Sequence, residues 1–235
     1  MADRYFVESP ITGDRAVVTD SEAHHLLHVM RAKPGMEVVL FDGEGAEFPA
    51  RVEKLSRSSV ELAILSRDEV DRELACTITL GVALPKGDRQ KWLVEKVVEL
   101  GVGRLVPLVT TRGVAQPVAQ ALARLERAVI EASKQCGRNR LMEIVEPRAW
   151  EDYVQEADPS ASRLIAHPGE AARLSTLPIS GNVYLAVGPE GGFTDDEVAL
   201  ARNAGWQAVD LGRRIVRVET AAAMLASWVA LKSQS

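Results

Sequence analysis

The chain has 235 residues, of which 46% are hydrophobic and 26% are charged, a composition typical of a folded globular protein and not of a disordered one. Its net charge of −5 excludes a broadly basic nucleic-acid-binding domain, so any surface for nucleic acid must be a local patch. The acidic excess lies in residues 1–72, which carry 9 Lys and Arg against 14 Asp and Glu.

Residues 1–72 predict a small, β-rich, barrel-like domain with one helix. We expect Asp20 or Ser21 to cap the helix "EAHHLLHVMR" and residues 34–35, a Pro-Gly pair, to end it. Apolar runs on both sides of residues 42–45 indicate a β-hairpin, and "SVELAILS" indicates a further strand. The acidic segment 67–74 has no hydrophobic periodicity, so it is expected to be the linker.

From residue 73 onward, expected strands and helices alternate, which is typical of an α/β fold with a parallel sheet. The expected strands are "CTITLGVAL", "RLVPLV", "RLIAHP", "NVYLAVG" and "QAVDLG". The expected helices are "DRQKWLVEKVVELG", "ALARLERAVIEASKQCG", a helix capped by Thr194, and "ETAAAMLASWVALK". Glu197 follows Thr194 by three residues and is expected to complete a capping box.

Three of these strands are followed by loops that combine glycine with charged, histidine or proline residues. They are residues 167–169, residues 188–192 and the segment from Gly212 onward. Ligands of open α/β sheets bind at the carboxyl ends of strands, and glycines allow a close approach of the backbone. The loop at 188–192 fits neither a dinucleotide-binding fingerprint nor a phosphate-binding loop. Because its carboxylate, Glu190, would repel phosphate, the loop is better suited to a neutral or cationic ligand. The plainer alternative is a tight turn with a solvated Glu190.

Basic residues gather in three places along the second half of the chain. Arg213, Arg214 and Arg217 precede Glu219 at the expected start of a helix, where Glu219 could also serve only as a cap. The other two patches are residues 86–91 and 134–140, for which a solvated surface is the usual alternative.

Two further motifs suggest chemistry that we do not expect. Cys136 lies among basic residues, as a nucleophile for methylation of a pyrimidine carbon would, but no activating base is adjacent. His24 and His28 have the spacing of two zinc ligands, but His25 stands where the zinc-protease motif needs glutamate. We therefore expect no metal. With only two cysteines, no signal peptide and no membrane-spanning stretch, the chain is expected to be cytoplasmic.

Five segments together are similar to one known family: "AVGPEGGFTDDE", "LGRRIVRVETA", "KGDRQKWLVEKVVELGV", "EASKQCGRNR" and "EAHHLLHVMRAKPGMEVVLFDGEG". On these motifs the chain is identified as a member of the RsmE family of ribosomal RNA methyltransferases, within the SPOUT superfamily. The resemblance implies a PUA-like RNA-binding domain at 1–72 and an α/β methyltransferase domain with a deep trefoil knot at 73–235. It further implies a homodimer that uses S-adenosylmethionine to methylate N3 of a specific uridine in 16S rRNA of the small ribosomal subunit.

The same resemblance assigns expected roles to individual residues. The cofactor is expected to contact Ala166, His167, Pro168, Val187, Gly188, Gly191, Gly192, Leu211, Gly212, Ile215, Arg217 and Thr220. RNA contacts are expected from Arg31, Lys86, Arg89, Lys134, Arg138, Arg140, Arg213 and Arg214. For catalysis, Arg138 or Arg217 would stabilise the negative charge on uracil O2 and O4, and Glu219 or Glu190 would accept the N3 proton.

Two other classes of function remain as alternatives. A non-catalytic RNA-binding factor for ribosome assembly would not need the glycine loop at 188–192, so cofactor binding distinguishes it from an enzyme. A nucleotide-dependent oxidoreductase is disfavoured because its glycine fingerprint is missing.

Overall fold

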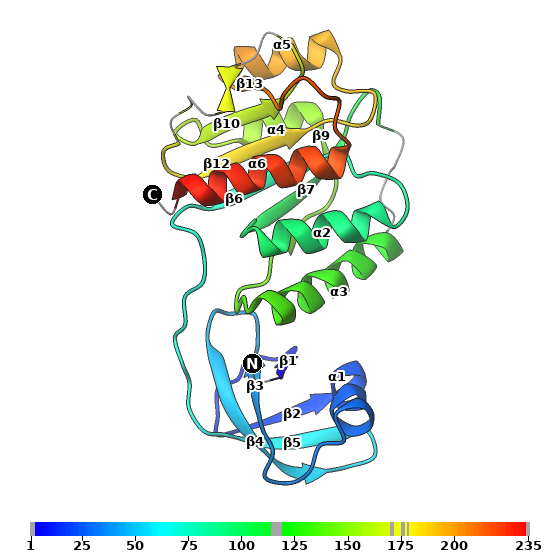
Figure 1. The fold of residues 1–235 in the computed structure, drawn as a ribbon, viewed down its shortest axis with the longest axis vertical. Coiled ribbons are helices and arrows are strands. Elements are labelled where there is room, and N and C mark those ends of the chain that lie inside the picture. Colours follow the sequence, from blue (N-terminus) through cyan, green and yellow to red (C-terminus); the bar gives the residue numbers. More distant parts are fainter. Residues whose placement is uncertain (1–2, 114–118, 170–171, 175–176, 178, 234–235) are drawn as a thin grey trace. The chain divides into compact units, whose positions relative to one another are not determined.

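The computed structural model describes residues 3–113, 119–169, 172–174, 177 and 179–233 (Figure 1). By their contacts the residues form two compact units. The first comprises Met1–Glu73 and Ser133–Leu141, and the second comprises Leu74–Ala132 and Met142–Ser235. Residues 133–141 therefore pack with the first unit although they lie far along the chain, an arrangement that the sequence did not predict.

The first unit contains a five-stranded sheet in the order β1-β3-β4-β5-β2. Its strands are β1 (Arg4–Phe6), β2 (Arg15–Thr19), β3 (Glu37–Phe41), β4 (Glu47–Leu55) and β5 (Ser59–Ile64). The antiparallel pairing of β3 with β4 confirms the hairpin around residues 42–45, and β5 is the further predicted strand. Tyr5, Leu26, Leu40 and Leu62 are fully buried in one hydrophobic core that includes residues of the sheet and of the helical segment at residues 20–29.

The helical segment of this unit differs from its prediction at both ends. It begins as α1 (Asp20–His24) with Thr19 as the N-cap residue, and no side chain caps it, because Thr19 Oγ1 donates its hydrogen bond to the Asp20 carboxylate. It continues as the π-helix η1 (His25–Val29) and ends before the predicted Pro-Gly pair. Arg31 has a φ of +52°, a left-handed conformation that cannot continue a helix.

The second unit is built on an eight-stranded sheet whose main order is β11-β13-β10-β12-β6-β7-β8, with β9 also paired to β7. Every pairing in it is parallel. The strands are β6 (Ile78–Val82), β7 (Arg104–Val109), β8 (Glu143–Ile144), β9 (Arg148–Ala149), β10 (Ser162–Ala166), β11 (Ala172–Arg173), β12 (Val183–Val187) and β13 (Gln207–Asp210). The five strands expected from the alternating pattern are all present.

Helices cover both faces of this sheet. The helices after residue 73 are α2 (Arg89–Glu99), α3 (Ala119–Cys136), α4 (Trp150–Glu156), α5 (Asp195–Asn203) and α6 (Val218–Ser233), and the residues of α3 from Ser133 onward belong to the first unit. Figure 1 shows α6 running across β12 and β6 with α2 beside it. Ile165 and Ala186 pack with α4 and α5 in one core. Because side chains alternate along a strand, Leu164 and Leu185 face the opposite side of the sheet.

Several local predictions for the second unit are confirmed. Thr194 accepts a hydrogen bond from the Glu197 N–H and donates its own N–H to the Glu197 carboxylate, which is the predicted capping box. Gly101 follows the C-cap of α2 with a φ of +82°. Helix α4 was not predicted. Its Tyr153 hydroxyl accepts the Gly81 N–H at 2.9 Å, and a Cβ at Gly81 would lie 2.5 Å from the Tyr153 ring, so only glycine fits there.

Candidate functional site

The three loops that the sequence selected follow three neighbouring strands. Residues 167–169 follow β10, residues 188–192 follow β12, and the segment from Leu211 follows β13. In the sheet β10 lies between β12 and β13, and both pairings are parallel, so the three loops leave from the same edge. This confirms that the loops meet at the carboxyl edge of the sheet, where α/β proteins bind ligands.

Asp210, the last residue of β13, ties two of these loops together. Its Oδ1 accepts the Gly212 N–H at 2.7 Å, and its Oδ2 accepts the Gly169 N–H at 3.3 Å. Both glycines have a φ of +112°, which other residues rarely adopt. The sequence analysis missed Asp210, although an Asp followed two residues later by a Gly is a recognised turn pattern.

The loop at 188–192 is held from two sides. A Cβ at Gly188 would lie 2.9 Å from the Phe193 ring and 3.1 Å from the Phe193 backbone nitrogen, so the chain turns there only with glycine. Arg112, which follows β7, donates a 2.9 Å hydrogen bond to the Gly191 carbonyl. Gly192 has a φ of +69°. No local pattern around Arg112 could have indicated this contact.

Arg89, at the start of α2, lies between the two candidate carboxylates. Its Nη2 donates a 2.9 Å hydrogen bond to Oε1 of Glu190, and its Nη1 lies 3.6 Å from Oε2 of Glu219. A hydrogen bond from the backbone N–H of Glu190 itself, the Arg89 guanidinium and the charge of Lys86 hold the pKa of the Glu190 carboxyl below its usual value. The sequence had predicted Arg89 only as an RNA contact.

Two buried polar atoms at this edge have no hydrogen-bond partner among the described residues. They are Nδ1 of His167 and Oε2 of Glu219. A buried polar atom without a partner costs free energy, so such atoms are typical of places where a ligand supplies the missing partner. They lie in the loop after β10 and in the first turn of α6.

This set of groups fits S-adenosylmethionine. The His167 ring nitrogen offers a hydrogen bond to a neutral adenosine, and the nearby carboxylates favour a positively charged sulfonium over a phosphate. Ala166 and Val187 are the last residues of β10 and β12, Pro168 and Leu211 begin the loops, and Thr220 lies in the first turn of α6. The structure thus brings the predicted cofactor residues to one edge of the sheet.

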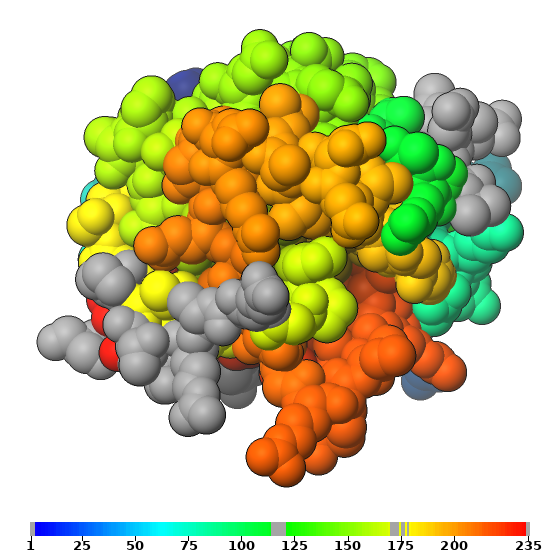
Figure 2. Space-filling view, turned by 90° about the horizontal axis from the view of Figure 1, so that it is seen from above, coloured from blue at the N-terminus to red at the C-terminus, as the bar shows by residue number. Residues whose placement is uncertain are grey.

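The segment 211–217 projects from this edge. Figure 2 shows it in deep orange, standing out from the surface. Arg213, Arg214 and Arg217 are exposed, and the Ile215 side chain is 99% exposed. Ile215 was expected to line the cofactor, and this role stays a prediction. Lys86 is also exposed, in the loop that connects β6 to α2.

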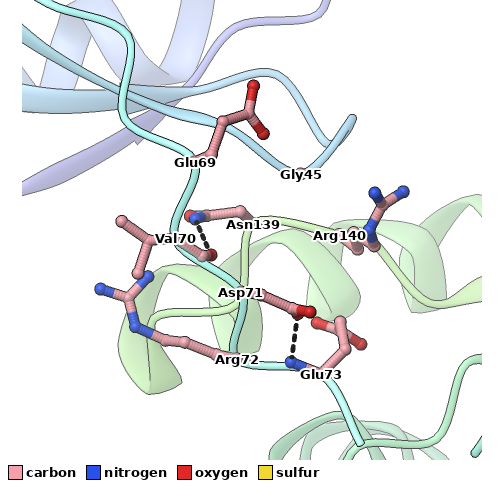
Figure 3. A pocket seen from close by; sticks show the side chains of 8 residues that line it. All are labelled: Gly45, Glu69, Val70, Asp71, Arg72, Glu73, Asn139 and Arg140. Carbon is pink, nitrogen blue, oxygen red and sulfur yellow. Dashed lines mark hydrogen bonds between the residues drawn. The ribbon is translucent and has the colours of Figure 1, made fainter. Parts of the chain in front are cut away.

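The remaining predicted basic residues belong to the first unit. Arg138 is buried and pairs with Glu73 through Nε at 3.0 Å and Nη2 at 2.5 Å, and Lys134 Nζ lies 2.7 Å from Glu22. Arg140 is exposed at the rim of a pocket of about 160 Å³ (Figure 3). The lining of this pocket also includes Gly45, Asn139 and residues 69–73, and Asn139 donates a hydrogen bond to the Val70 carbonyl.

The histidine pair and the two cysteines that the sequence analysis considered all lie within the described residues. His24 and His28 are exposed, with ring centroids 4.7 Å apart, and Arg31 is exposed just beyond η1. Within the described residues, no group of three or more His, Cys, Asp or Glu side chains is arranged to hold a metal ion. Cys76 and Cys136 are both free thiols. None of the described helices has the length and apolar character needed to cross a membrane.

Two family models match this chain. A model described as an RNA methyltransferase domain matches residues 72–230, and one described as an RNA methyltransferase PUA domain matches residues 18–65. These matches and the parallel sheet confirm the predicted fold class, an α/β domain preceded by a PUA-like domain. The trefoil knot and the assignment of RNA binding to residues 1–72 stay predictions.

Individual proteins are similar over nearly the whole chain. Ribosomal RNA small subunit methyltransferase E of Synechocystis is 32% identical, over 94% of this chain and 73% of its own. The crystal structure of the enzyme of that name from Neisseria gonorrhoeae, bound to S-adenosyl methionine, is 33% identical with a TM-score of 0.90, covering 100% of this chain and 98% of its own. A putative methyltransferase from Legionella pneumophila with the same bound cofactor is 32% identical with a TM-score of 0.91, covering 98% of this chain and 97% of its own.

Proposed function

The chain belongs to the family of ribosomal RNA small subunit methyltransferase E proteins, and from this premise we propose that it methylates N3 of a specific uridine in 16S rRNA with S-adenosylmethionine. The observation that carries the proposal is the Glu219 carboxylate. It is buried beside the cofactor loops, and its Oε2 has no hydrogen-bond partner among the described residues. A carboxylate in that state can accept a proton from a bound base.

The cofactor would be held by the three loops, which are connected by the hydrogen bonds of Asp210 and Arg112. The cofactor would lie against the backbone of Gly188 and Gly191 and accept or donate a hydrogen bond at the His167 ring, while the Gly212 N–H is already held by Asp210. When bound, S-adenosylmethionine supplies an electrophilic methyl group. The loops orient the reactants and keep water out, which accounts for much of the rate gain in a transfer between two bound molecules.

The proton at N3 of uracil is weakly acidic, and its removal spreads negative charge over O2 and O4. Of the two candidate acceptors we favour Glu219, because Glu190 is about half exposed and its pKa is held below its usual value by its own backbone N–H and by Arg89. Of the two candidate cations for the oxygens we favour Arg217. Among the described residues Arg217 forms no ion pair, whereas the guanidinium of Arg138 is engaged by Glu73.

The RNA contacts that we propose divide between the two units. In the second unit they are Lys86, Arg213 and Arg214, beside the cofactor loops, whereas Arg89 is engaged by Glu190 and Glu219. In the first unit they are Arg31 and Arg140, which are exposed, whereas Lys134 is paired with Glu22 and Arg138 is buried against Glu73. Because the first 72 residues carry an acidic excess, we expect weak binding to bare RNA and propose the assembled small subunit as the substrate.

We further propose that the protein acts as a cytoplasmic homodimer with a knotted second domain. Leu231 is 70% exposed and Met224 is 36% exposed on α6, which gives this helix apolar surface for a second copy. A two-fold interface there would allow the partner chain to add RNA contacts to the site.

The first test is calorimetric titration of the protein with S-adenosylmethionine, beside a Gly191→Val variant. Gly191 has no left-handed φ, and a Cβ there would meet only the Arg112 side chain, at 3.4 Å. The substitution is therefore expected to leave the fold intact and to obstruct only a ligand in the loop. Saturable binding that Gly191→Val abolishes, with an unchanged melting temperature, would support the proposed cofactor site.

The second test is mapping of methylated uridine after incubation with assembled small subunits from cells that lack this activity. One modified uridine, carrying its methyl group on N3, is the expected result. Absence of cofactor binding at millimolar concentration would contradict the enzyme and favour a non-catalytic assembly factor.

A further inference from the structure

Arg89 joins the glycine loop at 188–192 to the first turn of α6. We propose that it is a positioning residue: Glu190 anchors its guanidinium, and the anchored guanidinium orients the Glu219 carboxylate toward the base. This inference rests on the function proposed above, because it explains how the proton acceptor of that reaction is held. The proposal also assigns a structural role to Glu190, the one carboxylate among three glycines, because Glu190 holds the Arg89 guanidinium.

The two contacts of Arg89 are unequal. Nη2 donates to Glu190 at 2.9 Å, within the normal range of a charge-assisted hydrogen bond. Nη1 lies 3.6 Å from Glu219, which is an ion pair but too long for a hydrogen bond. Because a guanidinium is planar and rigid, a hydrogen bond that holds Nη2 also restricts the position of Nη1. Glu190 therefore determines where Arg89 stands, and Arg89 leaves the Glu219 oxygen open.

The surroundings of Glu219 are those expected of a proton acceptor whose hydrogen-bond donor is supplied by the substrate. Its side chain is 8% exposed, while that of Glu190 is 47% exposed. Oε2 has no hydrogen-bond partner among the described residues, although Arg89 balances its charge. A buried carboxylate needs both a counter-charge and hydrogen bonds to be stable. Arg89 supplies the counter-charge, and the missing hydrogen bond is left for the substrate.

The proton step balances with these residues alone. The N3–H bond of uracil breaks, its electron pair stays on the ring, and the proton forms an O–H bond with Oε2 of Glu219. Negative charge thereby passes from the carboxylate to the ring. Because Glu190 keeps Arg89 in place, the guanidinium does not have to move during this transfer.

The test compares Arg89→Ala, Glu190→Gln and the double variant in the full-length protein, with assembled small subunits as substrate. We expect Arg89→Ala to lower kcat about 100-fold and Glu190→Gln about 10-fold, with KM and cofactor affinity within about threefold of wild type. The double variant is expected to be no slower than Arg89→Ala, because Glu190 acts through Arg89. Millimolar guanidinium is expected to restore part of the Arg89→Ala activity.

A matched control is Lys96→Ala. Lys96 lies seven residues along the same helix, outside the basic patch at 86–91, and pairs with Glu99 at 2.7 Å. It is expected to keep its kcat within about twofold of wild type and to show no response to guanidinium.

The outcomes separate this proposal from the function on which it rests. If wild type is active but the two single effects multiply in the double variant, Glu190 does not act through Arg89, and the proposal is wrong. It is also wrong if Arg89→Ala loses kcat, cofactor affinity and melting temperature together, because that is the effect of a purely structural residue. A wild-type protein that binds cofactor but methylates no uridine overturns the proposed function and, with it, this inference.

Discussion

The carboxylate of Asp210 holds the backbone N–H of Gly212 at 2.7 Å, and this one contact fixes the start of the projecting segment 211–217. The other oxygen of the same carboxylate reaches Gly169, so a single side chain sets the spacing of two cofactor loops. Two acceptor oxygens on one side chain are required because both partners are donors.

Asp210→Asn is accordingly expected to weaken cofactor binding. An amide can accept from Gly212 or Gly169 with its oxygen, but its NH₂ group cannot accept from the other. Losing one hydrogen bond to a partly exposed charged group predicts a three- to tenfold rise in the Kd for S-adenosylmethionine, measured by calorimetry. Asp196→Asn, at an exposed position in α5, is the control and should leave the Kd unchanged. An equal rise in both variants would show that Asp210 has no specific part in the site.

Glu197 predicts a pH-dependent stability. Burial raises the pKa of its carboxyl, but hydrogen bonds from the Thr111 and Thr194 N–H groups outweigh burial and hold the pKa below the usual value of 4.5. A group whose pKa is lower in the folded state stabilises the fold above its unfolded pKa and loses this contribution as pH falls through the folded pKa. Glu197→Gln should therefore lower the free energy of unfolding by about 1–3 kcal/mol at pH 7.

The same difference should shrink as the pH is lowered below about 4.5, because the wild-type carboxyl becomes neutral too. Urea denaturation of both proteins at pH 7 and at several lower pH values measures it. A difference that stays constant over that range would mean that the charge of Glu197 is irrelevant to stability.

Arg138 can be tested as a structural or a catalytic residue through its partner. The guanidinium is buried, and Glu73 is its ion-pair partner at 2.5 Å. If Arg138 stabilises the uracil oxygens, Arg138→Ala lowers turnover far more than cofactor affinity, while Glu73→Gln, which keeps the guanidinium, leaves turnover largely intact.

If the pair is structural, both variants should instead lose stability by a similar amount, about 1–3 kcal/mol given the partial exposure of Glu73. Because Glu73 engages Arg138, we expect this second result. Melting curves recorded beside turnover numbers for the two variants decide between the two cases.

Ile215 provides a test of how the cofactor is held. Its side chain is almost wholly exposed, so it packs little against the rest of the protein. Ile215→Ala is expected to keep the Kd for S-adenosylmethionine within about twofold, since no buried apolar area is lost. Gly212→Ala forces a residue with Cβ to a φ of +112°, at a cost of about 1–3 kcal/mol, and is expected to weaken binding. A strong loss of affinity in Ile215→Ala would place that side chain against the cofactor.

The sequence by itself determined the features that depend on neighbouring residues. The capping box of Thr194 and Glu197, the hairpin at residues 42–45 and the order of strands and helices after residue 73 follow from turn chemistry and hydrophobic periodicity. The three functional loops could be selected for the same reason, because each consists of glycines and polar residues placed directly after a buried strand. The start of α1 was predicted wrongly, since the Asp20 carboxylate takes its hydrogen bond from Thr19 instead of from the helix.

Only the tertiary structure decided which of these residues meet. Arg89 and Glu190 are 101 positions apart, and Thr111 and Glu197 are 86 apart. Residues 133–141 pack with the first unit although the chain between them and Glu73 belongs to the second. Such contacts depend on strand order and on the path of the chain through the sheet. No local pattern encodes these, because the free energy that selects them comes from burying side chains of distant segments together.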